Sequence, residues 1–153
     1  MSHLTEVKMK FRDLESLQAA VEACGGEWRD KKTYAWWGSR AGGGDYGGLP
    51  PSEDGKCLFA IGQKGVEARN GHSGPWEIGV RKAADGDGYR LLYDYFGSAG
   101  NALHRTFGEN LSKVKQEYSV AVATKQAAVL ARQGYTLRRE AVGKRVRLHW
   151  VKR

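Results

Sequence analysis

Residues 76–97 constrain the fold of this chain more than any other stretch, because they predict a β-hairpin. In residues 76–80, Trp76, Ile78 and Val80 alternate with other residues, and residues 89–96 place an aromatic or aliphatic side chain at every second position. Side chains on a strand point to opposite faces with period two, so each run has one apolar face. Residues 84–88 between the runs contain two Asp-Gly pairs, which are typical of hairpin turns.

The remaining periodic stretches predict elements that join or cover this hairpin. Alternation predicts strands, and apolar residues spaced three or four apart predict helices. We expect strands at residues 3–11, 27–37, 56–62, 135–140 and 145–151, and helices at residues 14–24 and 101–133, with a kink possible at Gly108. The predicted fold is a single α+β domain over residues 1–153. Its mostly antiparallel sheet follows the order β-α-β-β-β-β-α-β-β, with two helices, one long, packed on one face.

Two stretches, residues 38–55 and 63–75, are rich in glycine and cannot form regular elements. Loops of this length in a small domain are either functional or disordered. They are therefore candidate contact surfaces.

Composition limits the class of protein. The first residues include Glu6, Lys8 and Lys10 rather than an apolar run, and no stretch approaches the ~20 apolar residues of a membrane helix. Cys24 and Cys57 form no spacing motif, which favours buried thiols over a disulfide. We expect a cytoplasmic, reduced protein without a membrane segment.

Charge is distributed unevenly along the chain. Residues 1–96 carry a net charge of −1, whereas residues 97–153 carry twelve Lys and Arg against three Asp and Glu, a net charge of +9. This asymmetry indicates a polyanionic partner, either nucleic acid or a nucleotide. The alternative is a solvated basic face that only aids solubility.

The densest basic group lies on the last predicted strand pair. A row of guanidinium groups on a sheet face can clamp phosphates bidentately. The alternative is a solvent-facing strand whose charges discourage edge pairing. The candidate anion-binding residues are Arg138, Arg139, Lys144, Arg145 and Arg147.

A second candidate group surrounds the first glycine-rich stretch. Aromatic rings and an Arg beside a glycine-rich backbone suit a base and its phosphate through stacking and charge. The candidates are Trp36, Trp37, Arg40 and Tyr46. The alternative is a flexible loop whose aromatic residues pack into the core.

Motifs for cofactor, metal or catalytic chemistry are incomplete. The GxGxxG of residues 42–47 is followed by Leu-Pro-Pro rather than by the helix that a dinucleotide site requires. Residues 85–88 lack the later ligands of a calcium loop, and the four His show no metal-ligand spacing. We therefore expect no cofactor and no metal, and the sequence favours a protein that is not an enzyme.

Several short motifs resemble, in their order, the family of the hypothetical chloroplast open reading frame 35, a domain-of-unknown-function family also widespread in bacteria and phages. The chain opens with Met-Ser-His, reaches Lys8-Met9 at the end of its first strand, and carries Asp-Tyr-Phe-Gly at residues 94–97. Gln-Glu-Tyr follows at residues 116–118 and Gly-Tyr-Thr-Leu at residues 134–137. The matching motif residues are His3, Asp94, Tyr95 and Tyr118. The resemblance supports the fold and implies no particular activity.

The leading functional hypothesis is a non-catalytic binding module for an anionic ligand, nucleic acid or nucleotide. An alternative is a protein–protein adaptor or inhibitor, phage-encoded, that uses the two irregular stretches as its contact surface. An enzyme acting on a small phosphorylated substrate ranks last. An edge strand or the aromatic face could also support a homodimer.

Overall fold

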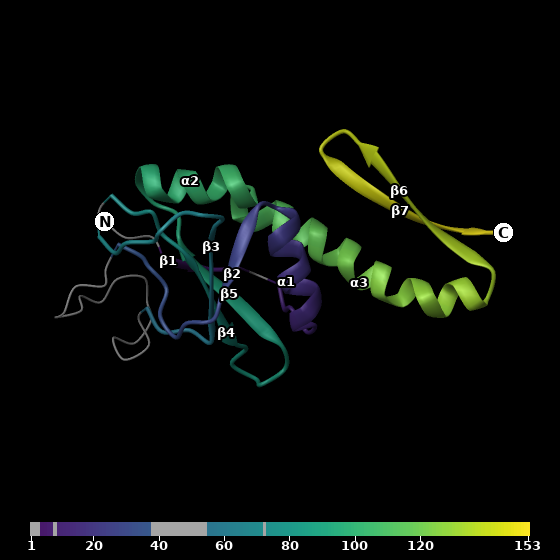
Figure 1. The fold of residues 1–153 in the computed structure, drawn as a ribbon, viewed down its shortest axis with the longest axis horizontal. Helices are drawn as coiled ribbons and strands as arrows, with labels where there is room; N and C mark the ends of the chain where they lie inside the picture. The colour runs from purple at the N-terminus through teal and green to yellow at the C-terminus, as the bar shows by residue number, and fades with distance from the viewer. Residues whose placement is uncertain (1–3, 8, 38–54, 72) are drawn as a thin grey trace.

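The computed structural model describes residues 4–7, 9–37, 55–71 and 73–153, and its architecture is α+β (Figure 1). Within these residues, five antiparallel strands form a sheet in the order β1-β5-β4-β3-β2: β1 (Leu4–Glu6), β2 (Gly26–Arg29), β3 (Phe59–Gln63), β4 (Ile78–Lys82) and β5 (Tyr89–Asp94). The helical segments are α1 (Leu14–Ala23), α2 (Gly97–Phe107), the 3₁₀ turn η1 (Glu109–Leu111) and α3 (Ser112–Arg132). Two last strands, β6 (Tyr135–Val142) and β7 (Arg145–Lys152), pair with each other. With α2, η1 and α3 taken as the long helix, the predicted element order is confirmed.

The predicted central hairpin is present as β4 and β5. Leu91 pairs with Val80 and Leu92 pairs with Gly79, and residues 83–88 make the turn. Alternation then places Val80 and Leu91 on the face that the helices cover, while Gly79 and Leu92 face the other side. The hairpin thus divides the interior into two layers, one on each face of the sheet.

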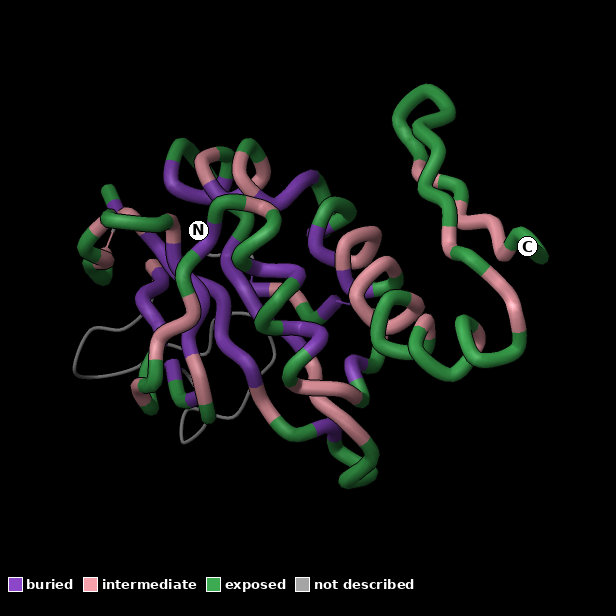
Figure 2. Tube along the Cα trace, turned by 45° about the vertical axis from the view of Figure 1, so that its right-hand side comes forward, coloured by how far each residue is buried: buried purple, intermediate pink, exposed green. Residues whose placement is uncertain are grey.

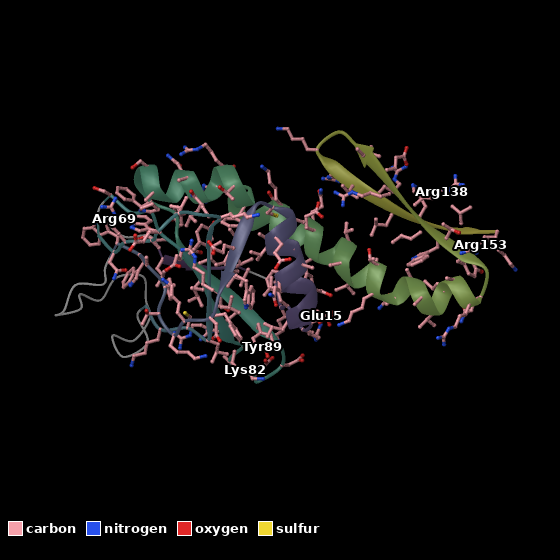
Figure 3. The ribbon with its side chains drawn as sticks, viewed as in Figure 1. Glu15, Arg69, Lys82, Tyr89, Arg138 and Arg153 are labelled. Carbon is pink, nitrogen blue, oxygen red and sulfur yellow. The ribbon has the colours of Figure 1, made fainter. Side chains whose placement is uncertain are left out.

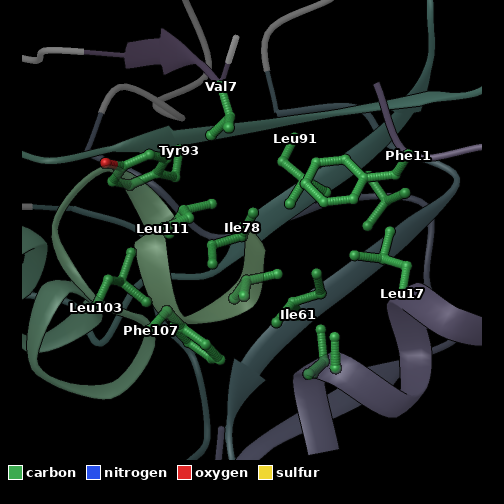
Figure 4. Packing of buried hydrophobic residues seen from close by; sticks show 14 of the residues in the cluster. Val7, Phe11, Leu17, Ile61, Ile78, Leu91, Tyr93, Leu103, Phe107 and Leu111 are labelled. Atoms are coloured by element: carbon green, nitrogen blue, oxygen red, sulfur yellow. The ribbon is translucent and has the colours of Figure 1, made fainter. Parts of the chain in front are cut away.

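The larger layer lies between the sheet and the helices (Figure 4). Ile61 and Ile78 from the sheet share it with Leu17 of α1 and with Leu103 and Phe107 of α2. All five side chains are fully buried. Burial of such a side chain contributes roughly 1.5–3 kcal/mol, so this layer supplies most of the hydrophobic stabilisation.

The second layer contains the aromatic part of residues 27–37, so the prediction that these residues form one strand is wrong. β2 ends at Arg29, and the chain then crosses the opposite face of the sheet, where Tyr34 and Trp36 are buried. Glycines on the sheet make the space: a Cβ on Gly79 would lie 2.5 Å from the Tyr34 ring, and a Cβ on Gly62 would lie 2.3 Å from the Arg29 guanidinium. The aromatic stretch therefore covers the sheet instead of extending it.

An ion-pair network fastens this crossing segment. The carboxylate of Glu77 is buried, accepts a hydrogen bond from the Ala35 amide at 3.0 Å, and lies 2.8 Å from the Arg29 guanidinium and 2.5 Å from the Lys31 ammonium. Two cations and an amide compensate the cost of burying the charge. The network is therefore structural and leaves Glu77 enclosed.

The long helix is broken at the kink that the sequence allows. Gly108 ends α2 with φ of 83°, and Asn110 and Leu111 follow with φ of 54° and 56° before α3 begins. Left-handed backbone is costly for residues with a side chain, so the joint is specified by packing rather than by local preference. Leu111 is fully buried there, which anchors the joint in the core.

The final hairpin stands apart from the main sheet. β6 and β7 pair over their whole length, from Tyr135 opposite Lys152 to Val142 opposite Arg145, and we call this two-stranded unit the ribbon. Figure 1 shows it beyond the main sheet, beside the C-terminal half of α3. Every residue of the ribbon and of that half of α3 is exposed or half-buried, whereas the buried residues lie in the part of the molecule around the main sheet, which we call the body (Figure 2).

Candidate nucleic-acid interface

The ribbon owes its shape to a tight turn and long alternating strands. Gly143, the first turn residue, has φ of 60°, which fits the type II′ turn that matches the twist of hairpin strands. Directly opposed residues lie on the same face of an antiparallel pair. The register therefore assigns every side chain to one of two faces.

The outward face carries the basic side chains. Arg138 lies opposite His149, Glu140 opposite Arg147, and Val142 opposite Arg145. The three arginines are exposed, and none of their guanidinium groups forms a hydrogen bond or an ion pair with the part of the chain that the structure describes. Glu140, whose carboxylate lies 3.0 Å from the His149 ring, is the acidic residue on this face. Three guanidinium groups thus remain available to an external anion.

The inward face is apolar and half-buried. It includes Leu137 opposite Trp150, and it faces α3, because Arg139 on the same face forms a bidentate pair with Glu117 at 2.7 and 3.2 Å. The hydrogen bonds that Arg139 donates to the Glu117 carboxylate raise the pKa of Arg139. This pair orients the ribbon so that its basic face points away from the helix.

Arg139 therefore does not lie on the same face as the other arginines of the predicted basic group, and the prediction is corrected at this residue. Arg138 and Arg139 are adjacent on a strand, so their side chains must lie on opposite faces. The charge of Arg139 is paired with the Glu117 carboxylate, so Arg139 holds the ribbon against α3. Alternation alone could have separated the two residues before the structure was known. Alternation also predicts that His149 shares a face with Arg145 and Arg147, and the register places all three on the outward face.

Lys144 lies at the turn of the ribbon and lines a groove of about 570 Å³ on the inward side. The groove runs between the ribbon turn and the body, where Cys24, Lys113 and Glu117 also line it. Lys144 is exposed and forms no ion pair with any described residue. It is placed to reach a ligand at the edge of the ribbon, and it does not belong to the outward row.

Charge accumulates on the ribbon because its cations outnumber its carboxylates. Residues 135–153 carry seven Lys and Arg and one acidic residue, Glu140. Figure 3 shows Arg138 and Arg153 on this unit, at the opposite end of the molecule from Arg69. Exposed like charges create a positive potential that attracts polyanions and weakens with added salt.

The two candidate stacking residues that the structure describes, Trp36 and Trp37, do not lie on the ribbon. Trp36 is 1% exposed, so no base can reach its ring while the protein is folded. The prediction that Trp36 stacks on a base is therefore corrected. Trp37 is half-buried and packs against the helix-side core. Arg40 and Tyr46 lie outside the described residues, as does most of the first irregular stretch on which the adaptor hypothesis depends.

The second irregular stretch is fastened to the body where the structure describes it. Arg69 donates its amide to the Pro75 carbonyl at 2.8 Å, and Gly71 accepts the indole N–H of Trp76 at 2.7 Å. Arg29 donates to the carbonyls of Gln63 and Val66 at 2.9 and 2.5 Å. These bonds satisfy main-chain groups and hold the described part of the stretch against the sheet.

The residues of the family resemblance have structural contacts. Asp94 is buried and accepts the Phe96 amide at 3.0 Å, and the exposed ring of Tyr95 stacks on His104 with 6.5 Å between ring centroids. The Tyr118 hydroxyl accepts hydrogen bonds at the entrance to α1. His3 lies outside the described residues.

Thiol and metal chemistry find little support in the described chain. Burial raises the pKa of both Cys24 and Cys57 to about 11, which disfavours the reactive thiolate. Among the residues with described positions, no three His, Cys, Asp or Glu cluster as metal ligands. The described helices include none with the length and apolar character to cross a membrane.

Comparison of the chain with known protein families, with curated proteins and with solved structures finds no match. Kinship with the chloroplast open reading frame 35 family therefore stays a prediction. The functional interpretation rests on the geometry of the ribbon.

Proposed function

We propose that this protein is a non-catalytic nucleic-acid-binding module whose contact surface is the outward face of the ribbon. The observation that carries the proposal is the row of exposed arginines at 138, 145 and 147, which have no ion-pair partner among the described residues. Guanidinium groups bind phosphates through paired hydrogen bonds. A free-standing row of them suits an anion that presents many phosphates.

The shape of the surface favours a polymer over a free nucleotide. Small ligands bind in concave pockets that cover most of their surface. The outward face belongs to a two-stranded sheet that projects from the body, and the groove lined by Lys144 lies on its other side. A nucleic acid can lie along such a face and contact several arginines at once.

The test is the affinity of the full chain for a fluorescein-labelled 20-base-pair DNA, measured by anisotropy at ~0.1 M salt. Arg145→Ala combined with Arg147→Ala should weaken binding at least tenfold, because a hydrogen bond to a charged group contributes roughly 1.5–3 kcal/mol. The matched control, Lys64→Ala combined with Arg69→Ala, removes two exposed charges outside the ribbon, of which Arg69 lies at the opposite end of the molecule (Figure 3). It should leave the affinity within about twofold of wild type.

Two results would contradict the proposal. The wild-type chain could fail to bind any nucleic acid at low salt, or both double variants could lose affinity equally. The second result would show that net charge alone governs binding and that the ribbon has no special role.

A further inference from the structure

The ribbon combines a width, a length and a set of side chains that together suit one form of nucleic acid. Resting on the proposed function, we infer that the ribbon enters the major groove of duplex DNA with its outward face toward the base edges. The body and α3 then remain outside the groove.

The dimensions of the ribbon fit this groove. Two paired strands lie about 4.8 Å apart, and the major groove of B-DNA is about 12 Å wide and admits a two-stranded ribbon. Each strand has eight residues, which corresponds to roughly 26 Å of length. Side chains on one face recur about every 7 Å, close to two base-pair steps of 3.4 Å.

The isolation of the ribbon makes this entry possible. β6 and β7 pair only with each other within the described chain, and the inward face of the ribbon contacts α3, where Arg139 pairs with Glu117. The outward face is covered by no other described element, and its arginines are exposed. A ribbon merged with the main sheet would be too wide to enter a groove.

The side chains of the outward face match the groups in a major groove. Arginine donates a bidentate pair to O6 and N7 of guanine, and a carboxylate accepts from N4 of cytosine. Arg138, Arg147 and Glu140 lie near the middle of the face, with Glu140 directly opposite Arg147. Lys144, exposed at the turn end of the ribbon, is placed to meet a phosphate at the edge of the groove.

Other nucleic acids fit less well. Single strands are held by aromatic side chains on which bases stack, but the rings of Tyr135 and Trp150 belong to the inward face. The major groove of A-form RNA is too narrow for side chains to read. The outward face therefore favours duplex DNA over both alternatives.

The experiment compares one sequence in three forms, as a DNA duplex, as its single strand and as the RNA duplex, by anisotropy with the full chain at equal salt. We expect the DNA duplex to bind at least tenfold more tightly than either of the others. Methyl green, which occupies the major groove, should displace the protein, whereas netropsin, which occupies the minor groove, should not.

Variants separate reading of bases from attraction to phosphates. Arg147→Lys keeps the positive charge but removes the planar fork, so it should weaken duplex binding several-fold while leaving single-strand binding unchanged. Circular dichroism checks that the variant folds. Equal affinity for all three forms, or displacement by netropsin alone, would overturn groove entry while leaving the proposed function intact. Failure to bind any of the three would overturn both.

Discussion

At the scale of single residues, one hydroxyl group joins the long helix to the start of α1. Tyr118 is buried, and its oxygen accepts hydrogen bonds from the amides of Arg12 at 2.9 Å and Asp13 at 3.0 Å. Asp13 in turn caps α1 through Ser16 and pairs with Lys125 of α3. A small number of polar contacts thus fixes the angle at which α3 leaves the body.

Replacing Tyr118 with Phe should lower the free energy of unfolding by about 1–3 kcal/mol, because two amide donors lose their acceptor. Urea denaturation measures the change. Tyr135→Phe is the control, since that hydroxyl forms no hydrogen bond with a described residue and its loss should matter little. Equal changes in the two variants would show that the Tyr118 hydrogen bonds do not stabilise the junction.

The two thiols should respond to pH in a way set by burial. The pKa of Cys24 and of Cys57 is raised from 9.0 to about 11, so at pH 8 the folded protein should react with iodoacetamide about a hundredfold more slowly than the urea-unfolded chain. The folded state keeps its thiol protons between pH 9 and 11, while the unfolded state loses them. Stability should therefore be intact below pH 9 and fall as the pH rises toward 11. Fast native alkylation at pH 8 would contradict this.

At the scale of elements, the joint between α2 and α3 depends on one glycine. Gly108 has positive φ, and a Cβ there would lie 2.3 Å from the Ser112 hydroxyl and 2.8 Å from the Lys113 nitrogen. Gly65 has a similar φ of 73° but open space around it. The two positions therefore separate backbone strain from steric overlap.

Gly65→Ala should lower the free energy of unfolding by about 1–2 kcal/mol, the cost of a left-handed residue with a side chain. Gly108→Ala should lower it by more, because the overlap adds to the same strain. Thermal melts of both variants measure the difference. If the two variants are equally stable, the joint tolerates a side chain and its geometry is not specified by Gly108.

Local patterns predicted the elements that depend on neighbours in sequence. The hairpin of β4 and β5 follows from its Asp-Gly turn and its alternation, and the kink follows from Gly108. The end of β2 could not be found in this way, because Tyr34 leaves the strand line to pack over Gly79, more than forty residues away. Long-range space on the sheet, rather than local propensity, decides where that strand stops.

The candidate site was predictable to a similar degree. The concentration of basic residues in the last strand pair predicted the position of the candidate site, and alternation predicted that Arg145, Arg147 and His149 share one face. The role of Arg139 could not be anticipated, because its partner Glu117 lies on another element whose position depends on the whole fold. The burial of Trp36 depends on the sheet in the same way.

At the scale of the whole molecule, the described structure consists of a buried body and an exposed basic ribbon. The buried core of the described chain contains no residue of the ribbon, whose inward face is only half-buried against α3, and the Arg139–Glu117 pair at that junction is partly exposed. Surface ion pairs contribute roughly 0–1 kcal/mol. The body should therefore fold without the ribbon.

Deleting residues 134–153 should lower the Tm by no more than about 4 °C, which corresponds to roughly 1 kcal/mol for a chain of this size. The deletion should also abolish binding to duplex DNA. Calorimetry and anisotropy on the same preparation measure both properties. A truncated chain that still binds DNA would place the binding surface on the body.

A competing basic cluster makes the location of binding the decisive question. Lys56, Arg81 and Lys82 line a second depression of about 260 Å³ on the body. The direct measurement is a ¹⁵N–¹H NMR titration of the full chain with a DNA duplex. We predict that the largest amide shifts fall within residues 136–151 and that residues 56–58 and 81–82 stay unchanged. Shifts centred on residues 56–58 and 81–82, with the ribbon unaffected, would contradict binding through the ribbon.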